Sequence, residues 1–507
     1  MVAKVTSVAP IGFEGALIEI EADLKQGLPS MQIVGLGNKS IDEAKERVRS
    51  AIGNSLLEFP AKKLTINLAP AELPKDGAHY DLPIALAVLA ISGQLRQEEL
   101  SGSVFAGELA LDGSLRPIRG SINIAEAAQR AGYSRLYLPA TNADQASLIN
   151  NLEIIAVKNL KELFLHLKNE QPLTAYQKSA PEPAAASSAQ PDVLLDDIHG
   201  QMQAKRALTI ATAGRHNILL NGSPGAGKTM LAKALLGLLP PLTDSEMIAT
   251  TKLHSLAGEV DGEILTKRPF RAPHHTASRT ALTGGGSKPK PGEISLAHLG
   301  VLFLDELPEY PRATLEALRQ PLEDRQIAVA RAGGRVTYPA DFMLVATMNP
   351  CPCGYYGDSQ RECSCSSSQI MAYQKRLSGP LLDRIDLIIN VSRVPHDTLL
   401  EAKPSSNNQH LTAVAQINQA ISSQNKRYQY RPKYNNSLSS REITALVPLD
   451  QKSKQLLSAA TERLGLSARA YFKIIRVART IADLDGEENV NLKHISEALQ
   501  YRGTIKT

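Results

Sequence analysis

A glycine-rich stretch followed by an acidic strand end constrains this chain most. The glycine-rich stretch is GSPGAGKT, residues 222–229, and the acidic stretch VLFLDE follows at residues 301–306. The first fits the pattern of Gly, four residues, then Gly-Lys-Thr, and lies between an apolar run at 218–220 and a helical pattern at 230–239. Strand, loop and helix in this order form the context in which such a loop binds phosphates. The sequence therefore predicts a site for a nucleoside triphosphate.

The residue types of the loop explain how it would bind phosphate. Glycines let the backbone turn so that its N–H groups face the phosphates, and the helix N-terminus adds a favourable dipole. Lys228 is expected to reach the β- and γ-phosphates, and the Thr229 hydroxyl to hold Mg²⁺. The residues expected to contact ATP here are Gly222, Ser223, Pro224, Gly225, Ala226, Gly227, Lys228, Thr229 and Met230.

The acidic stretch supplies the carboxylates that triphosphate hydrolysis needs. Four apolar residues predict a buried strand that ends in Asp305 and Glu306. We expect Asp305 in the magnesium shell and Glu306 beside the attacking water. A second buried strand, at 342–347, ends near Asn349, whose amide is placed to orient water against the γ-phosphate. An unrelated turn and an ordinary strand end explain this order of motifs less well.

Length and composition indicate a globular protein of several domains. The chain has 507 residues, of which 43% are hydrophobic and 21% charged, and this suits about two to four domains. The net charge of +5 does not by itself indicate nucleic-acid binding. No apolar stretch is long enough to cross a bilayer, and MVAKVTSVAP lacks the apolar core of a secretory signal. We therefore expect a cytoplasmic protein without a membrane partner.

The first 170 residues predict a mixed α/β domain. Alternating runs at 16–20 and 64–68 predict strands, and residues 40–53 and 83–93 show helical periodicity.

Two segments of this domain resemble the protease domain of Lon: KDGAHYDLPIALAVLA at 75–90 and GELALDGSLRPIRG at 107–120. His79 stands where the Lon family has its nucleophilic Ser, and Ile122 where it has its Lys. A Ser–Lys mechanism needs a hydroxyl beside a neutral amine. The resemblance therefore implies the fold without the catalytic dyad, and a structural role is favoured for His79.

Composition divides the rest of the chain. Residues 171–192 are rich in Pro, Ala and Ser and predict a flexible linker. Residues 193–392 predict an ATPase core, and residues 393–507 a helical lid domain. At the start of the core, Ile198 and Gly200 are expected to pack around the adenine, since an apolar side chain and a close backbone suit a flat heterocycle.

Two basic segments of the core are candidates for contact with the phosphates of a nucleic acid. The first, residues 268–298, predicts a loop-rich insertion, and the second is a predicted hairpin at 326–338 with an AGG turn, preceded by a helix at 312–325. Charged loops are most often solvated surface, but in a ring motor they can face the channel and touch phosphates. The insertion holds Arg268, Arg271, Arg279, Lys288 and Lys290, and the candidates for DNA contact are Lys288, Lys290, Arg331 and Arg335. His274 and His275 lack an evident third metal ligand, so packing or phosphate contact is favoured there.

All four cysteines of the chain fall within CPCGYYGDSQRECSC. The residues are Cys351, Cys353, Cys363 and Cys365, and this clustering is typical of a local site and not of a disulfide framework. Two pairs of thiolates suit a tetrahedral structural Zn²⁺, although the CxC spacing is less common than CxxC. Redox-active or free thiols and an iron–sulfur cluster remain the alternatives.

Two arginines are candidates for contact with a nucleotide across a subunit boundary. Arg384 in SGPLLDRID has carboxylates on both sides, Asp383 and Asp386, so a local ion pair is one interpretation. The other is an arginine finger that offsets transition-state charge at the neighbouring subunit's nucleotide. Arg469 begins a basic amphipathic helix at 465–486 and could reach a γ-phosphate as a second sensor.

Together these motifs resemble the ComM/YifB proteins, a magnesium-chelatase-like branch of the AAA+ ATPases. The resemblance covers essentially the whole chain and is most specific in the histidine-pair segment RPFRAPHHT and in the CPCG of ATMNPCPCG. It implies an AAA+ core with a helical lid, preceded by a Lon-like α/β domain. It also implies a homo-hexameric ring that hydrolyses ATP with Mg²⁺ and moves on single-stranded or branched DNA. The activity implied is a helicase for branch migration in natural transformation, with recombination proteins as candidate partners.

Two points stay open at the level of sequence. In this branch an extra helix can move the lid, so Arg469 acts either on its own nucleotide or on the neighbour's. The other candidate function is a chelatase-type motor that remodels a protein partner and never threads DNA. The name magnesium chelatase is itself only an analogy of fold.

Overall fold

The computed structural model describes residues 2–35, 38–73, 75, 77–177, 193–260, 262–285, 290–331, 334–358, 360–394, 408–429 and 433–502. Most of the predicted linker, residues 178–192, lies outside the described residues, as does Lys288. The backbone of Arg331 and Arg335 is described, but their side chains are not. None of the described helices is long and apolar enough to span a membrane.

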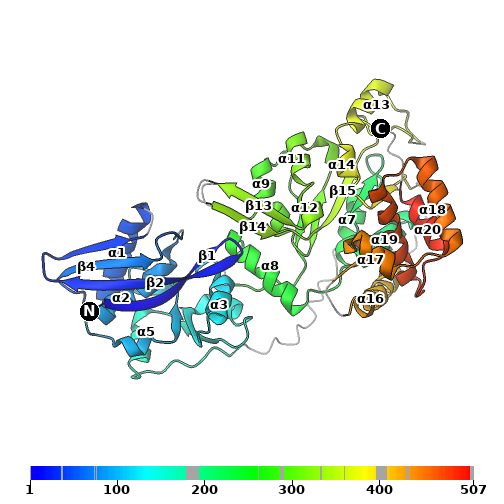
Figure 1. The fold of residues 1–507 in the computed structure, drawn as a ribbon. Coiled ribbons are helices and arrows are strands. Elements are labelled where there is room, and N and C mark those ends of the chain that lie inside the picture. Colours follow the sequence, from blue (N-terminus) through cyan, green and yellow to red (C-terminus); the bar gives the residue numbers. More distant parts are fainter. Residues whose placement is uncertain are drawn as a thin grey trace.

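The N-terminal part is built on a seven-stranded sheet with the order β3-β4-β2-β1-β5-β8-β9 (Figure 1). Its strands are β1 (Val2–Ile11), β2 (Glu14–Lys25), β3 (Ser30–Val34), β4 (Lys63–Ala69), β5 (Ser103–Phe105), β8 (Arg135–Pro139) and β9 (Glu153–Val157). β1 pairs with β2 and β2 with β4 in antiparallel register, while β5, β8 and β9 are parallel. The expected strands at 16–20 and 64–68 are confirmed as β2 and β4.

Helices complete this part of the chain. They are α1 (Asn38–Asn54), α2 (Asp81–Ile91), α3 (Ser121–Arg130), α4 (Ala143–Ala146) and α5 (Leu160–Leu167), with a short pair of strands, β6 (Glu108–Leu109) and β7 (Leu115–Arg116). Residues 82–89 of α2 are all buried, because this helix is apolar on every side and passes through the core. The predicted helices at 40–53 and 83–93 are confirmed as α1 and α2.

The central part is a five-stranded parallel sheet with the order β11-β12-β15-β10-β16. The strands are β10 (Ile218–Asn221), β11 (Phe270–Arg271), β12 (Val301–Leu304), β15 (Met343–Met348) and β16 (Leu387–Asn390). β12 and β15 are buried along their whole length, as expected of parallel strands covered on both faces. All carboxyl ends therefore meet at one edge of the sheet.

Helices and a hairpin surround this sheet. The helices are α6 (Met202–Gly214), α7 (Lys228–Leu236), α8 (Asp244–Ala257), α9 (Arg279–Thr283), α10 (Glu293–Leu296), α11 (Arg312–Ala317), α12 (Pro321–Asp324), α13 (Ser367–Gln374) and α14 (Gly379–Leu382). The predicted hairpin is confirmed as β13 (Gln326–Arg331) and β14 (Gly334–Pro339), with Ala330 opposite Arg335. The single helix predicted at 312–325 is wrong: it is broken into α11 and α12, because Pro321 has no N–H to continue the helix.

The C-terminal helices share a core with the parallel sheet. They are α16 (Gln409–Arg427), α17 (Ser440–Leu446), α18 (Gln451–Leu464), α19 (Ala468–Leu484) and α20 (Leu492–Gln500), gathered at one end of the molecule in Figure 1. Ile417 and Ile474 belong to the same buried apolar cluster as Leu208 of α6 and Leu231 of α7. Burial of this shared apolar surface fixes the helices against the sheet.

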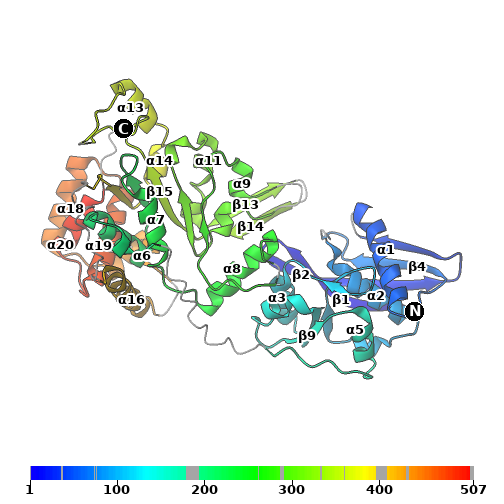
Figure 2. The ribbon, with the colours of Figure 1, turned by 180° about the vertical axis from the view of Figure 1, so that it is seen from behind.

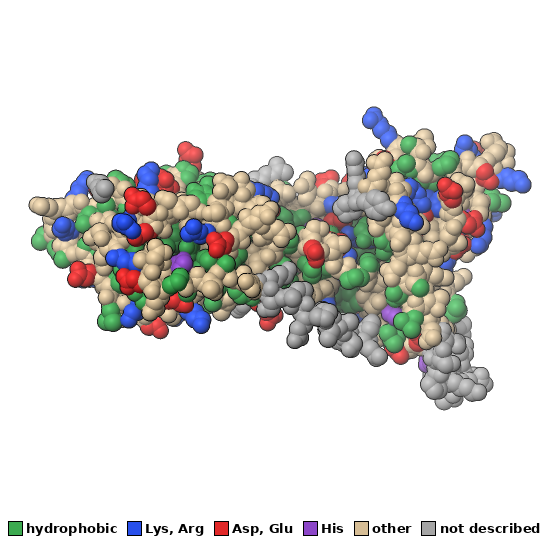
Figure 3. All heavy atoms as spheres, turned by 90° about the horizontal axis from the view of Figure 1, so that it is seen from below, with side chains coloured by type: hydrophobic (Ala, Val, Ile, Leu, Met, Phe, Trp, Pro, Cys, Tyr) green, Lys and Arg blue, Asp and Glu red, His purple; other side chains and the backbone are tan. Residues whose placement is uncertain are grey.

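The N-terminal part touches the central part through α3 and α8, which lie side by side in both views (Figures 1 and 2). The Ser255 hydroxyl of α8 accepts the N–H of Gly120 at 3.1 Å. Lys252 of α8 pairs with Glu126, and its ammonium group lies 4.1 Å from the ring centre of Phe13. Over the N-terminal part of the face in Figure 3, acidic and basic side chains are interspersed.

A buried ion pair ties the residue before β16 to α19. Asp386 lies 3.0 Å from the Lys473 ammonium group, and both side chains are almost fully buried. Asp386 also accepts the N–H of Asn217 at 2.9 Å. Burial alone would raise the pKa of Asp386, but Lys473 and the His216 ring hold it well below its usual range. The carboxylate is therefore charged, and it makes its contacts with Lys473 and Asn217 inside the fold.

We expect Asp386→Asn to destabilise the chain by about 3–5 kcal/mol, because it leaves the Lys473 charge buried without a counter-ion. Urea denaturation of the full chain measures this loss. The matched control is Glu19→Gln, which removes the exposed partner of Lys4 and should cost less than about 1 kcal/mol. Equal stability of the two variants would contradict the assignment.

Candidate active site

The glycine-rich loop lies at the carboxyl end of β10 and leads into α7. Gly225 and Gly227 have φ angles of +79° and +86°, a region that glycine adopts without strain. A Cβ atom at either position would meet no other atom within 4 Å, so the loop faces open space. At Gly222 a Cβ atom would lie 2.2 Å from the carbonyl oxygen of Val391. The loop is thus an open cradle of backbone groups, pinned at one end against the segment after β16.

The Lys228 ammonium group lies within this cradle. It donates to the carbonyl oxygens of Gly222 at 2.5 Å and Ser223 at 3.0 Å, and to Oδ1 of Asn349 at 3.1 Å. Burial lowers the pKa of Lys228, and the nearby charges of Asp305 and Glu306 oppose that shift. The structure therefore brings the predicted lysine and the predicted asparagine into direct contact.

Asp305 and Glu306 follow β12 at the same edge of the sheet and are exposed. The buried Thr347 of β15 holds both: its hydroxyl donates to Asp305 Oδ1 and accepts the Glu306 N–H at 3.0 Å. Glu306 has a φ of +52°, a conformation that costs free energy unless its surroundings fix it. Sequence reasoning did not find Thr347, and its one signal was its position two residues before Asn349.

The oxygen atoms at this edge suit a hard divalent cation. Thr229 opens α7 and is exposed, as is Asp305, and hydroxyl and carboxylate oxygens are the ligands that Mg²⁺ prefers. These two side chains are therefore the candidates to hold it.

The segment predicted to contact the base lies beside the loop. Ile198 is 6% exposed, and the Gln201 amide next to Gly200 donates to the carbonyl oxygens of Ala226 at 3.4 Å and Ser392 at 2.5 Å. Gly200 has a φ of +63°. Met230, by contrast, is 44% exposed and points away from the core.

Arg384 lies at the opposite edge of the sheet from the loop. It precedes β16, and its carbonyl oxygen accepts from the amide of Asn217, which precedes β10. β10 and β16 are parallel, and a strand of four residues spans about 13 Å. Arg384 is thus at the amino edge, separated by the strand length from the phosphate loop of its own chain.

Arg469 lies at the same edge and shares a carboxylate with Arg384. Glu323 of α12 accepts from Arg469 Nη2 at 2.5 Å and from Arg384 Nη2. Arg384 also donates to the carbonyl oxygens of Arg319 at 2.8 Å and Pro380 at 2.7 Å. A cavity of about 660 Å³ is lined by these two arginines and Glu323. Sequence reasoning missed Glu323, because nothing in the local pattern of 312–325 distinguishes it.

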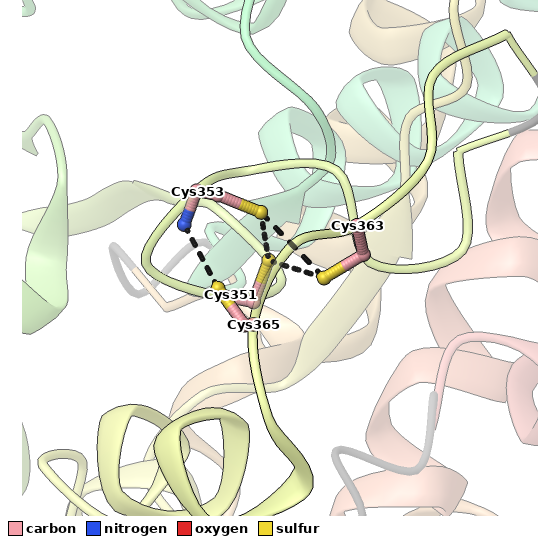
Figure 4. Close-up of side chains that lie close together, drawn as sticks. All are labelled: Cys351, Cys353, Cys363 and Cys365. Atoms are coloured by element: carbon pink, nitrogen blue, oxygen red, sulfur yellow. Dashed lines mark hydrogen bonds between the residues drawn. The ribbon is translucent and has the colours of Figure 1, made fainter.

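The four cysteines converge in space (Figure 4). The Sγ atom of Cys351 lies 3.4 Å from that of Cys353 and 3.6 Å from that of Cys363, and Cys353 and Cys363 are 3.5 Å apart. Cys365 completes the group, in which all four sulfur atoms lie within 4.8 Å of one another. None of them forms a disulfide. In a tetrahedral thiolate site with metal–sulfur bonds of about 2.3 Å, neighbouring sulfur atoms lie about 3.8 Å apart, so the group fits one metal ion.

Two arginines of the predicted basic insertion form ion pairs within the fold. Arg268 pairs with Glu246 at 2.8 Å and Arg271 with Glu293 at 2.6 Å. These two are therefore not free for phosphate contact, whereas Lys290 and Arg279 are exposed. The ring centres of His274 and His275 lie 4.1 Å apart, and among the described residues only the cysteines form a group of three or more metal-ligand side chains.

The Lon-like part lacks a nucleophile at the expected positions. His79 is buried, and its Nε2 lies 3.2 Å from the carbonyl oxygen of Val8. Burial lowers the pKa of His79 to about 4, so the ring is neutral at pH 7. Ile122 is fully buried in α3. The histidine is a packed, hydrogen-bonded part of the core, in agreement with a structural role.

We expect Thr347→Val to slow ATP hydrolysis by about 10- to 100-fold while ATP binding is retained, because Asp305 and Glu306 are the predicted catalytic carboxylates and their misplacement should cost rate more than affinity. Steady-state hydrolysis and fluorescent nucleotide binding measure the two effects. Thr209→Val is the control, since that hydroxyl donates only to the Lys205 carbonyl within α6. ATP hydrolysis by Thr347→Val at the wild-type rate would contradict a positioning role for Thr347.

Family profiles of a magnesium chelatase subunit match most of the chain. "Magnesium chelatase, subunit ChlI" matches residues 194–399, "Subunit ChlI of Mg-chelatase" residues 20–142, and "Magnesium chelatase, subunit ChlI C-terminal" residues 409–502.

Two relatives match over nearly the full length, and a third matches part of the chain. Competence protein ComM of Haemophilus influenzae is 44% identical over 505 residues, 99% of this chain and 98% of that protein. The protein YifB of Escherichia coli is 43% identical over 498 residues, 97% of this chain and 96% of its own. A Lon protease of Citrifermentans bemidjiense is 28% identical over 192 residues, 34% of this chain and 22% of that protein. The chain therefore belongs to the ComM/YifB family of magnesium-chelatase-like AAA+ ATPases.

Proposed function

We propose that this chain forms a hexameric ring that hydrolyses ATP to move on DNA, as a helicase that promotes branch migration of recombination intermediates in natural transformation. The relative from H. influenzae, which aligns along 99% of this chain, is named a competence protein, and that name supports a role in competence. The single structural observation in favour of a ring is the position of Arg384 and Arg469 at the sheet edge opposite their own phosphate loop.

In the proposed site the chain binds the triphosphate across the carboxyl edge of the sheet. Mg²⁺, held by Thr229 and Asp305, would neutralise charge on the β- and γ-phosphates. Lys228 binds the same phosphates, and its contact with Asn349 holds the amide next to them. Glu306 orients the attacking water. The Thr347 hydroxyl holds Glu306 in place by accepting its backbone N–H.

The cation that completes the site comes from the neighbouring subunit. Arg384 cannot cross the length of β16 to its own γ-phosphate, and Arg469 is joined to Arg384 through Glu323. We assign both to the neighbour's nucleotide, where positive charge offsets that of the transition state. Glu323 pairs with both arginines in the isolated subunit.

The DNA would be contacted by the β13–β14 hairpin and the basic insertion. Arg331 and Arg335 flank the hairpin turn in the register of the two strands, and Lys290 is exposed beside an isolated bridge to Gly285. Together with Lys288 they are the proposed phosphate contacts, which bind without regard to base sequence.

For the cysteine cluster we assign a structural Zn²⁺, because four thiolates with no open position suit that ion.

A chelatase-type motor that remodels a protein partner is the second candidate, favoured by the three family profiles of a magnesium chelatase subunit. Hydrolysis that does not respond to DNA, together with a stable protein client, would support it.

We expect forked DNA to stimulate ATP hydrolysis and a labelled strand to be displaced by the wild type. Glu306→Gln should bind ATP but displace no strand, because the attacking water is no longer activated.

Replacement of both Arg331 and Arg335 by Ala should reduce the slope of log affinity against log salt by about 1 to 2, since two phosphate contacts are lost. Arg96→Ala, an exposed arginine of the N-terminal part, is the matched control. Unchanged DNA binding and unwinding in the hairpin variant would reject the hairpin as the DNA contact.

Mixed rings test the assignment of Arg469. Lys228→Ala removes the phosphate contact of one subunit, and Arg469→Ala removes the cation given to another, so each pure variant should be inactive. A mixture should regain part of the hydrolysis, because a Lys228→Ala subunit still offers Arg469 to an intact phosphate loop next to it. The hydrolysis rate against mixing ratio measures this. No recovery at any ratio would place Arg469 at its own nucleotide.

A further inference from the structure

The cysteine cluster adjoins the nucleotide site along the chain. Cys351 follows Asn349 by two residues and is fully buried, while the other three cysteines are partly exposed. The loop that they close, residues 351–365, is described except for Ser359. The helix that follows returns to the same place, because Gln374 of α13 donates to the Pro350 carbonyl oxygen at 3.1 Å.

This cysteine loop, residues 351–365, contacts the phosphate loop at two of its residues. Gly354 packs on the Pro224 ring so closely that a Cβ atom would lie 2.6 Å from its Cδ. The Asp358 side chain is 3% exposed, and the nearby Ser223 hydroxyl holds the pKa of its carboxyl below the usual value. These contacts join the cysteine loop to the first half of the nucleotide cradle.

Arg393 reinforces the contact from the other side. It lies 3.5 Å from Asp358 and donates to the Pro224 carbonyl oxygen at 2.9 Å. Its guanidinium group also lies 5.3 Å from the ring centre of Tyr355. A cavity of about 710 Å³ adjoins this arrangement, with Gly222 and Ser223 among its lining and with Tyr356, Gly357 and Asp358 from the cysteine loop.

The loop has little apolar surface of its own to hold this position. Among its described residues only Cys351 and Gly354 are buried as whole residues, and Asp358 buries a charged side chain and no apolar one. A segment of this length that buries so little is costly to order. A metal ion bound by the four thiolates would supply the missing free energy, since binding to a site absent from the open chain is folding free energy.

We propose that the metal ion bound by Cys351, Cys353, Cys363 and Cys365 holds the cysteine loop against Ser223 and Pro224, so that metal occupancy sets the affinity of the phosphate loop for nucleotide. The inference rests on the proposed ATP site and extends it: the metal centre is a control element for nucleotide binding and takes no part in the chemical step. Loss of the metal releases Gly354 and Asp358 from the phosphate loop and moves Asn349, while the cores of the three parts stay intact.

The chain offers a clean test, because these are its only cysteines, and a thiol reagent can therefore act nowhere else. Elemental analysis of the purified full-length chain should find one zinc per chain. Displacement of the metal with a mercurial, followed by a thiol and a chelator, should weaken binding of a fluorescent ATP analogue by about tenfold or more, as expected when several ordering contacts are lost. Zn²⁺ should restore the affinity, and Mg²⁺ alone should not.

Two controls separate this effect from unfolding and from failure of the proposed function. Circular dichroism and the main melting transition should be preserved after metal removal. Asp358→Asn, which leaves the four ligands in place, should keep the zinc but weaken nucleotide binding in the same direction. The readout needs no DNA, so an absence of unwinding would not affect it, whereas a zinc-loaded wild type that binds no nucleotide would overturn the ATP site itself. Equal nucleotide affinity with and without the metal, or a chain that holds no metal, would overturn the inference.

Discussion

The parallel five-stranded sheet is the constraint on which the proposed chemistry depends. Because β10, β12 and β15 run in one direction, their carboxyl ends bring Lys228, Asp305 and Asn349 to a single edge. The same parallel order places Arg384 before β16 and therefore at the other edge. A subunit with this sheet carries the proposed phosphate-binding edge and the edge with Arg384 and Arg469 on opposite sides, which suits the proposed head-to-tail assembly of identical subunits.

Two side chains outside the motifs position the groups within them. Thr347 bridges the two carboxylates at the end of β12, and Glu323 joins the two arginines at the amino edge. Each comes from a different element from the groups it holds. Such contacts restrict the motion of long polar side chains, so the geometry is set before a nucleotide binds.

The Lon-like part keeps its fold although the catalytic dyad is absent. Its core is closed around α2 and the seven-stranded sheet, and His79 takes part in that core through Val8. Ser255 and Lys252 of α8 attach this part to the central sheet. A second contact joins the β1–β2 turn to the hairpin, where a Cβ atom at Gly12 would lie 2.3 Å from Val336. A movement of the hairpin would therefore displace the β1–β2 turn of the N-terminal part.

The sequence by itself determined the features that depend on neighbours along the chain. The phosphate loop, the acidic end of β12, the hairpin and the clustered cysteines each follow from spacing and residue type within one short segment, and so does the family. Only the tertiary structure decided which of these groups meet. It used Arg268 and Arg271 in internal ion pairs, and placed Arg469 beside Arg384 through Glu323. The physical reason is that such pairs join residues far apart in the chain, and their geometry is set by strand order and helix packing, which no local pattern records.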